Sequence, residues 1–382
     1  MKRTEFIDSF KRILSQLNKK KYSVIASVCR TLLGMVFIFS GAVKAIDPWG
    51  TVYKIEDYLR EFGSFFIELM PMAEIAAWSL IILELLLGVC MLLNVRTRWT
   101  SWITLVFYSI MTLLTLYIAR TNPVKDCGCF GDAIILSNWQ TFYKNVILIV
   151  LATMLFILRK HVQPLWKGWV ELVIAIVVVV GAVSFMVWTK LHLPIMDFRP
   201  YKIGNHLPTL TKEVADQYEW TFILEKDGVR KSFTIDNYPT EAGWTFIDRD
   251  SIMTKKGIKP VIEDFVITGF SDTEISTNNI LESNKVTLVI IYDMNKADEK
   301  QFAKIEQLHK QCIQANESFY ILTGSTTNEI NDFIEQHPTL SKTFCVCDPV
   351  TLKTIVRANP GVIVLQNGTI IDKYNLRNRY NY

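Results

Sequence analysis

The sequence predicts an α-helical membrane bundle followed by an α/β domain that lies outside the cytoplasm. Half of the 382 residues are hydrophobic, and they are concentrated in the first half of the chain. There, several runs of about twenty residues carry few charges, which is the length a helix needs to cross about 30 Å of hydrocarbon. Basic residues flank alternate runs, and from residue 191 onward the composition is that of a soluble protein.

Five membrane-spanning helices are expected. They are predicted at residues 22–46, 75–93, 102–118, 142–158 and 170–188. The first is too long for the core of a signal peptide and lacks a small-x-small cleavage site, so we expect it to remain as an anchor. Five crossings place the two ends of the chain on opposite sides of the membrane.

The basic residues predict the orientation. By the positive-inside rule, the lysine- and arginine-rich segment 1–21 stays in the cytoplasm, and every second loop should then be cytoplasmic and basic as well. Both such loops are basic, with Arg96 and Arg98 in one and Arg159, Lys160 and Lys167 in the other. We therefore expect a multi-pass protein of a bacterial inner membrane, with its C-terminal domain in the periplasm. The net charge of +4 is too small to indicate a nucleic-acid partner.

Four ionisable residues lie in or near the first two spans, namely Arg30, Lys44, Glu74 and Glu84. Such residues are costly in lipid unless they face the bundle interior and find a partner. Counting from the span ends predicts an Arg30–Glu84 pair, with Lys44 and Glu74 near each other at the outer ends. These pairs either fix the helix register or give Glu84 a role with protons or a quinone.

The loop between the third and fourth spans contains the most specific motif, Asp-Cys-Gly-Cys-Phe-Gly-Asp at residues 126–132. Two cysteines separated by one glycine, Cys127 and Cys129, can close a very small and readily reduced disulfide ring. Lys125 would favour a thiolate, whereas the neighbouring aspartates oppose it. The alternatives are a turn with structural or free thiols and, less readily, a metal site. No metal site is predicted, because the loop offers only two thiols and no histidine.

The spacing of the seven cysteines excludes two common sites. No C-x-x-C pair occurs anywhere in the chain, which excludes a standard zinc ribbon and a plain thioredoxin active site. Cys29 and Cys90 lie within predicted spans, where a cysteine is most often a small apolar side chain.

Three stretches of the membrane half resemble the DoxX and MauE group of small membrane proteins. They are residues 30–50, 84–94 and the CGCFGD motif region at 126–132, so the resemblance covers about the first 160 residues. MauE-type proteins are linked to maturation of methylamine dehydrogenase, a disulfide-rich periplasmic enzyme, and work beside a thioredoxin-like partner. The resemblance implies a four-span bundle and a thiol–disulfide role for Cys127 and Cys129. It does not imply methylamine as a substrate, and the fifth span is an addition.

The second half shows strand and helix patterns. Two alternating runs flank Asp227-Gly228, which is a strong hairpin signal. From residue 286 the order is strand, helix, strand, helix, then a short strand at 342–348, a helical turn, and a hairpin with its turn at Asn367-Gly368. This order predicts an α/β sandwich.

The order resembles the thioredoxin-like fold over about residues 260–375. Pro360 precedes a hydrophobic strand where that fold carries its cis-proline, so Asn359–Pro360 is a candidate cis bond. The fold's C-x-x-C should fall near residues 293–300, and this segment contains no cysteine. The resemblance therefore implies a thioredoxin-like domain without the usual dithiol.

Three further cysteines lie in this half. Cys345 and Cys347 point to the same face of a predicted strand, at a separation near the upper limit for a disulfide. They are either core residues or a second thiol pair that exchanges with the loop. We expect Cys312, on an amphipathic helix, to lie in the core.

The predicted segments are a basic cytoplasmic N-terminus (1–21), a DoxX/MauE-like four-helix membrane domain (22–160), a fifth transmembrane helix (161–190), a linker and hairpin region (191–259) and a thioredoxin-like domain (260–382). Two functions fit them. One is a membrane-bound accessory of extracytoplasmic thiol–disulfide exchange or protein maturation, with Cys127 and Cys129 as the redox pair and the C-terminal domain docking a client or redox partner protein. The other is a non-catalytic membrane anchor or assembly subunit that presents a binding domain, which the missing C-x-x-C favours. A transporter is disfavoured by the lack of internal repeats. No cofactor is evident, and a quinone acceptor has no motif in the sequence.

Overall fold

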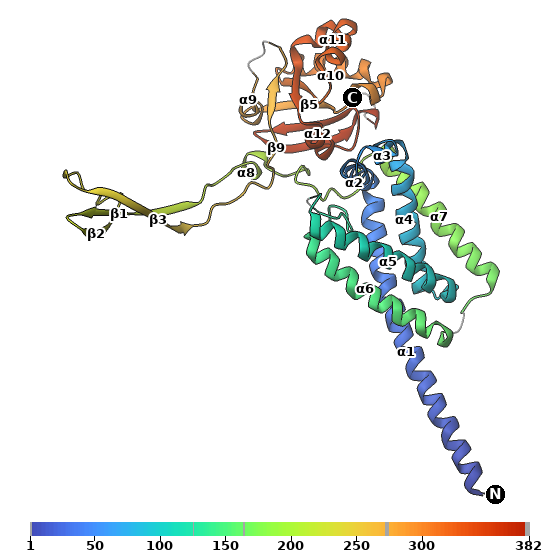
Figure 1. Cartoon of the computed structure of the whole chain (residues 1–382). Coiled ribbons are helices and arrows are strands. Elements are labelled where there is room, and N and C mark those ends of the chain that lie inside the picture. Colours follow the sequence, from blue (N-terminus) through green and yellow to red (C-terminus); the bar gives the residue numbers. More distant parts are fainter. Residues whose placement is uncertain (1, 125, 163–164, 272–274, 379–382) are drawn as a thin grey trace. The chain divides into compact units, whose positions relative to one another are not determined.

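The computed structural model describes residues 2–124, 126–162, 165–271 and 275–378, and the side chains of these residues from Lys20 onward (Figure 1). The chain forms two compact units. One comprises residues 1–199 and 377–382, and the other comprises residues 200–376. The division between them falls inside the segment 191–259 that was expected to contain a linker.

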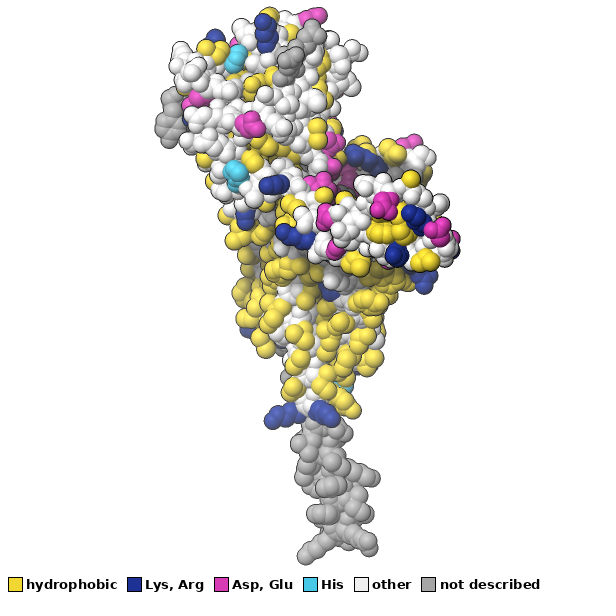
Figure 2. Space-filling view, turned by 90° about the vertical axis from the view of Figure 1, so that its left-hand side faces the viewer, with side chains coloured by type: hydrophobic (Ala, Val, Ile, Leu, Met, Phe, Trp, Pro, Cys, Tyr) yellow, Lys and Arg dark blue, Asp and Glu magenta, His cyan; other side chains and the backbone are white. Residues whose placement is uncertain are grey.

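The first unit is a bundle of long helices. Their bounds are α1 Lys2–Ile46, α2 Pro48–Glu61, α4 Ala73–Leu92, α5 Thr97–Thr121, α6 Asn138–Leu158 and α7 Gly168–Leu191. Five segments are long and apolar enough to cross a membrane, namely 20–46, 70–92, 97–121, 138–161 and 168–191. They confirm the five predicted spans. Hydrophobic side chains cover much of the outer surface of this unit (Figure 2), as expected for helices that face lipid.

Helix α2 was not predicted, and it lies in the connection between the first two spans. Its first residue is Pro48, and the Asp47 carboxylate caps it by accepting a hydrogen bond from the Gly50 amide at 3.1 Å. Both features favour a helix start. The apolar face of α2, with Val52 buried, packs against Ala73 and Ala77 of α4. The opposite face is free to contact the α5–α6 loop.

Glycines fix how α1 and α4 pack. A Cβ atom at Gly88 of α4 would lie 2.8 Å from the backbone nitrogen of Ile38 in α1. A Cβ at Gly41 of α1 would lie 2.8 Å from Leu85 of α4. Small residues at such contacts let two membrane helices approach closely. The register of the two helices is therefore set by backbone proximity at these glycines.

This register overturns the predicted Arg30–Glu84 pair. Arg30 lies beside the last turn of α4, where its guanidinium donates hydrogen bonds to the carbonyl oxygens of Met91 and Leu92. Glu84 lies about two helical turns before Leu92 on α4, which is about 12 Å along the helix axis. Its partner is Lys44. Counting from the span ends failed because the glycine contacts, and not the ends of the apolar runs, decide which residues face each other.

The expected pairing of Lys44 with Glu74 is also wrong, because Lys44 pairs with Glu84. Glu74, on the first turn of α4, forms an ion pair with Lys190 of α7. The Lys190 ammonium also lies 5.2 Å from the centre of the Trp49 ring. The fifth helix supplies the partner, and helix–helix packing against α7 could not be foreseen from the first two spans alone.

The connection between the first two spans, which contains α2, and the α5–α6 loop are both expected on the outer side of the membrane. They lie at the same end of the bundle. The Tyr58 hydroxyl of α2 donates a hydrogen bond to the Cys127 carbonyl in the α5–α6 loop at 2.9 Å. The α4–α5 connection and the connection that leads into α7 also lie together. The Arg96 guanidinium of the former lies 3.1 Å from the carboxylate of Glu171, at the start of α7. These contacts agree with alternating loops on alternating sides.

The second unit is built on a six-stranded sheet with strand order β4-β7-β6-β5-β8-β9. The strands are β4 Ile267–Gly269, β5 Lys285–Ile291, β6 Ser318–Thr323, β7 Phe344–Cys347, β8 Gly361–Gln366 and β9 Thr369–Asn375. The helices are α9 Thr277–Leu281, α10 Phe302–Gln314, α11 Thr327–Gln336 and α12 Pro349–Ile355. Strands β5, β6 and β7 are parallel, and the others pair antiparallel. The predicted order of strands and helices is confirmed.

Two features of this unit differ from the prediction. The short strand β4 pairs with β7 and has no alternating pattern that would reveal it. In addition, residues 204–207 of the expected linker are hydrogen-bonded to the β8–β9 hairpin. The Gly204 amide donates to the Ile370 carbonyl at 2.8 Å, and the Leu207 amide donates to the Gly368 carbonyl at 2.9 Å. Residues 204–207, which lead into the short helix α8 (Leu207–Leu210), therefore pack along the start of β9.

A separate three-stranded antiparallel sheet has the order β2-β1-β3. Its strands are β1 Gln217–Lys226, β2 Val229–Thr234 and β3 Thr245–Lys255. The predicted hairpin is confirmed, with both Asp227 and Gly228 at positive φ. The third strand was not predicted, because its apolar residues do not alternate with polar ones.

Replacing Gly88 by alanine should destabilise the bundle, because the new methyl group collides with the backbone of α1. We expect a loss of about 1–3 kcal/mol, as for other overpacked sites. Gly181 on α7 is the matched control, since no atom lies within 4 Å of a Cβ built there. Thermal unfolding of both variants in detergent measures the difference. Equal effects of Gly88→Ala and Gly181→Ala would contradict the assigned register.

Candidate functional site

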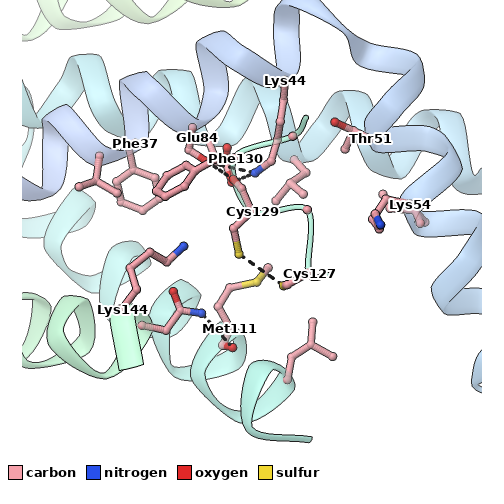
Figure 3. Close-up of a pocket in the computed structure, with 18 of the residues that line it drawn as sticks. Phe37, Lys44, Thr51, Lys54, Glu84, Met111, Cys127, Cys129, Phe130 and Lys144 are labelled. Atoms are coloured by element: carbon pink, nitrogen blue, oxygen red, sulfur yellow. Dashed lines mark hydrogen bonds and ion pairs between the residues drawn. The ribbon is translucent and has the colours of Figure 1, made fainter. Parts of the chain in front are cut away.

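The site is a cavity of about 260 Å³ inside the helical unit, and the CGC loop forms one of its walls (Figure 3). Helices α1, α2, α4, α5 and α6 supply the remaining lining residues. The cavity therefore brings together segments that are more than one hundred residues apart in sequence. The predicted site residues Lys44, Glu84, Cys127 and Cys129 all line it, whereas Arg30 and Glu74 do not.

A tight turn shapes the loop. Gly128 and Gly131 both have positive φ, at 66° and 52°, a backbone conformation that glycine adopts without steric cost. The Asp126 carboxylate accepts a hydrogen bond from the Gly128 amide at 2.9 Å, and the same aspartate forms a 3.2 Å ion pair with Lys54 of α2. The turn is thus fixed both by its own glycines and by a charge on α2.

The two thiols of the motif are in contact. The Sγ atoms of Cys127 and Cys129 lie 3.4 Å apart, and both side chains are half-buried free cysteines. A disulfide bond is about 2.05 Å long, so the sulfur atoms would need to approach by about 1.4 Å to form one. The loop therefore already holds the thiols close to bonding distance.

Two hydroxyl groups hold the backbone of the motif. Tyr58 donates to the Cys127 carbonyl, and Ser40 of α1 donates to the Cys129 carbonyl at 2.7 Å. The Ser40 contact is to a main-chain oxygen atom, whereas the Tyr58 hydroxyl also forms a side-chain hydrogen bond with Cys127. The loop is thus anchored to α1 and α2 on both sides of Gly128.

The environment makes the two thiols unequal. The pKa of Cys129 lies below its ordinary value, first because its sulfur accepts a hydrogen bond from the Cys127 thiol and then because the ammonium groups of Lys144 and Lys44 are near; burial opposes this shift. The pKa of Cys127 is raised, because it donates that hydrogen bond and is buried. Cys129 is therefore the thiol that ionises first. Lys125, which the sequence also offered, lies outside the described residues.

A buried ion pair lies next to Cys129. Lys44 and Glu84 are each about 5% exposed, and their Nζ and Oε1 atoms are 2.6 Å apart. The Lys44 ammonium also donates to the Ser40 hydroxyl at 3.0 Å, and Ser40 donates to the Cys129 carbonyl. A continuous hydrogen-bonded chain thus runs from Glu84 through Lys44 and Ser40 to the backbone of the motif. Figure 3 shows Lys44 and Glu84 beside Cys129.

Sequence reasoning missed four side chains of this site, namely Ser40, Lys54, Tyr58 and Lys144. One signal was available, because residues four apart share a face of a helix. Lys54 and Tyr58 are such a pair on α2, and Ser40 and Lys44 are another on α1. Lys144 of α6 had no comparable signal, and its ammonium lies 4.4 Å from the centre of the Phe130 ring.

The cysteines of the second unit are more deeply buried than those of the CGC loop. Cys345 and Cys347 are free and buried, and burial raises the pKa of each to about 12. Thiols in this environment are poor nucleophiles, which favours the packing interpretation over a second redox pair. Cys312 lies in the core, as predicted. The Asn359–Pro360 bond is cis, as predicted.

The described residues contain no group of three or more histidine, cysteine or acidic side chains placed to hold a metal ion. The lining of the cavity offers amine, carboxylate, hydroxyl and thiol groups. Among these, only the paired thiols can exchange electrons. The arrangement can therefore form and break one disulfide beside a buried ion pair.

Fold and site together define a multi-pass membrane protein with a dithiol loop. Residues 22–158 match the family described as methylamine utilisation protein MauE, so this segment is a MauE family domain. The match covers the first four spans and the CGC loop and ends before α7, which confirms the MauE resemblance and the additional fifth helix. Residues 218–256, the three-stranded sheet, match a domain of unknown function, DUF8463. No curated protein and no solved structure matches the chain.

Replacing either Lys44 or Glu84 alone with leucine should destabilise the protein more than replacing both. One substitution leaves a buried charge without its partner, at a cost of about 3–5 kcal/mol, whereas an apolar pair is close to neutral. Thermal unfolding of the two single variants and the double variant tests this. If the double variant is the least stable of the three, the ion pair does not explain why these residues are present.

Proposed function

We propose that the protein is a membrane-bound accessory of extracytoplasmic thiol–disulfide exchange, in which Cys127 and Cys129 are the exchanging pair. The observation that carries this proposal is the contact of two half-buried thiols, 3.4 Å apart, in a loop whose backbone is held by α1 and α2. The MauE family domain supports a role in protein maturation. The clients are extracytoplasmic proteins with cysteine pairs.

The exchange follows ordinary disulfide chemistry. When the loop is oxidised, a client thiolate attacks one loop sulfur and a mixed disulfide forms. The second client thiol then attacks the client sulfur of that bond, leaving the client oxidised and the loop as a dithiol. In the reverse direction, Cys129 attacks a client disulfide, because it is the loop thiol that ionises first, and Cys127 resolves the intermediate.

The second unit would dock clients without reacting with them. We propose that its six-stranded sheet is thioredoxin-like, on the basis of the parallel centre β5-β6-β7, the flanking helices and the cis-proline before β8. The Asn359 amide group donates to the Asp293 carbonyl at 2.6 Å, which places the cis-proline loop beside the segment 293–300. That segment has no cysteine, so the domain lacks the dithiol that would make it an oxidoreductase on its own.

Exchange through the loop predicts trapped intermediates. Changing Cys127 or Cys129 singly to serine should leave the protein folded and inserted, because serine has nearly the size of cysteine and the hydrogen bonds to the loop carbonyls are kept. Function should fail. Each single variant should also accumulate mixed disulfides, since the remaining cysteine cannot be resolved by its neighbour. Non-reducing electrophoresis of membranes followed by identification of the attached chains measures this.

Cys345→Ser and Cys347→Ser are the matched controls, because both thiols are buried and their pKa values are raised. They should lower stability and trap nothing. Full function of the Cys127→Ser/Cys129→Ser double variant in its host would reject the redox role. A non-catalytic anchor that presents a binding domain would then be the better description.

The proposal also requires the CGC loop and the second unit to lie outside the cytoplasm. The basic residues of the second and fourth connections indicate this orientation. A reporter that is active only outside the cytoplasm, fused after Tyr382, should therefore be active. The same reporter inserted in the loop at residues 159–167 should be inactive. Activity in the opposite pattern would place the loop in the reducing compartment, where an exchanging disulfide does not persist.

A further inference from the structure

The cavity behind the CGC loop extends among the membrane spans. Its inner wall carries an aromatic cluster, with the Phe37 ring 5.2 Å from Phe107 and 5.1 Å from Tyr108 between ring centres. These residues belong to α1 and α5, within the segments long and apolar enough to cross a membrane. A ligand that occupies this space is therefore bound at membrane depth and against aromatic surface.

The polar groups of the cavity are few and lie close to the thiols. Glu84 is 4% exposed, and its Oε1 atom pairs with Lys44. Its Oε2 atom is buried and has no hydrogen-bond partner in the part of the chain that the structure describes. A buried carboxylate oxygen without a partner is costly. Its position in the lining of a cavity indicates that a ligand supplies the missing hydrogen bond.

Donors for the same ligand are also present. An ammonium group has three N–H donors, and Lys44 uses two of them on Glu84 and Ser40. One remains for a carbonyl oxygen. Lys144 lines the cavity from α6, and in Figure 3 it lies on the other side of Cys129 from Lys44. The cavity thus offers a cationic donor on two walls, an unpartnered acceptor and a flat aromatic surface.

The volume restricts what can bind. Ligand pockets commonly measure about 300–1,000 Å³, and this cavity, at about 260 Å³, lies just below that range. It has room for one small ring system and not for a nucleotide or a folded peptide. A flat ring that dissolves in lipid and interconverts between a carbonyl and a hydroxyl form meets these requirements. Its carbonyl oxygen accepts a hydrogen bond from Lys44, and its hydroxyl group, once formed, donates to Glu84 Oε2.

We infer that the cavity binds the ring of a lipid quinone, which accepts two electrons from the Cys127–Cys129 dithiol. This inference rests on the proposed function, because it names the acceptor for the same thiol pair. In the reaction, both S–H bonds break and one S–S bond forms. The two electrons and two protons pass to the quinone oxygens, so the products are a disulfide and a quinol.

The named residues have distinct positions in this step. Cys129 faces the cavity beside Lys44 and Lys144, and it supplies the first electrons to the ring as a thiolate. Lys44 donates to one quinone oxygen and stabilises the charge that develops there. Glu84 Oε2 accepts a hydrogen bond from the hydroxyl group of the quinol. Both residues therefore contact the bound ring through its oxygen atoms.

Binding is tested with the full-length protein in lipid nanodiscs. The Cys127→Ser/Cys129→Ser double variant should bind a short-chain benzoquinone or a short-chain naphthoquinone without reducing it. Binding to the folded state raises the unfolding temperature as the quinone concentration increases. The two quinone classes form separate arms, and the one giving the larger shift identifies the ring. No shift with either at saturating concentration overturns the inference, and this arm needs no cavity substitution.

Glu84→Gln tests the carboxylate and keeps the shape of the side chain. It should weaken binding of the quinol, whose hydroxyl group donates to Oε2, and slow reoxidation of the reduced loop by about tenfold or more, which corresponds to one hydrogen bond to a charged group. Glu74→Gln is the matched control, since Glu74 lies on the same helix and does not line the cavity. It should leave both quantities unchanged. Equal effects of the two substitutions overturn the role of Glu84.

The electron transfer is measured in the wild-type protein without oxygen. After reduction, added quinone should convert Cys127 and Cys129 to a disulfide and yield one quinol per disulfide, read by thiol alkylation and ultraviolet absorbance. If the loop exchanges with clients but no quinone oxidises it, this inference fails and the proposed function stands. If quinone binds while the thiols never exchange with a client, the proposed function fails instead.

Discussion

The hydrogen-bonded chain from Glu84 through Lys44 and Ser40 to the Cys129 carbonyl connects the helix bundle to the CGC loop. A buried ion pair in a membrane bundle is stable only when its partners are held in register and their remaining hydrogen bonds are satisfied. Lys44 bonds both Glu84 and Ser40, whereas the second carboxylate oxygen of Glu84 has no partner among the described residues. The position of Cys129 therefore depends on the pairing of two charges on α1 and α4.

That pairing depends in turn on the close contact of α1 with α4. Gly41 and Gly88 lie where any larger side chain would collide with the opposite helix. Their contacts place Lys44 opposite Glu84 and leave Arg30 at the far end of α4. A substitution that separates the two helices would disturb the ion pair and, through Ser40, the loop. Packing, electrostatics and thiol chemistry are thus linked through one helix interface.

The parts of the structure set by local sequence were predictable. The five spans follow from uninterrupted apolar length, and the two hairpin turns follow from Asp227-Gly228 and Asn367-Gly368. The CGC loop was identifiable because a single glycine separates its two cysteines in the sequence. The cis bond at Asn359–Pro360 was expected only from the resemblance to the thioredoxin-like order of elements, which carries a cis-proline at this place.

The parts set by contacts between distant segments were not predictable. Which charge faces Glu84 depends on how α1 slides along α4, and no single helix contains that information. The partner of Glu74 comes from α7, more than one hundred residues away. Tyr58 and Lys144 reach the site only because α2 and α6 fold back toward the loop. Strand β4 and the packing of residues 204–207 beside β9 have the same origin.

We propose that Cys127 and Cys129 form one two-electron couple. A redox titration of the full-length protein in membranes tests this, with each of the seven cysteines followed by alkylation and mass spectrometry. Cys127 and Cys129 should change together from two alkylated thiols to a protected disulfide at one potential, while Cys345 and Cys347 should remain thiols throughout. Loop cysteines that stay reduced under oxidising conditions, or that oxidise independently of each other, would contradict it.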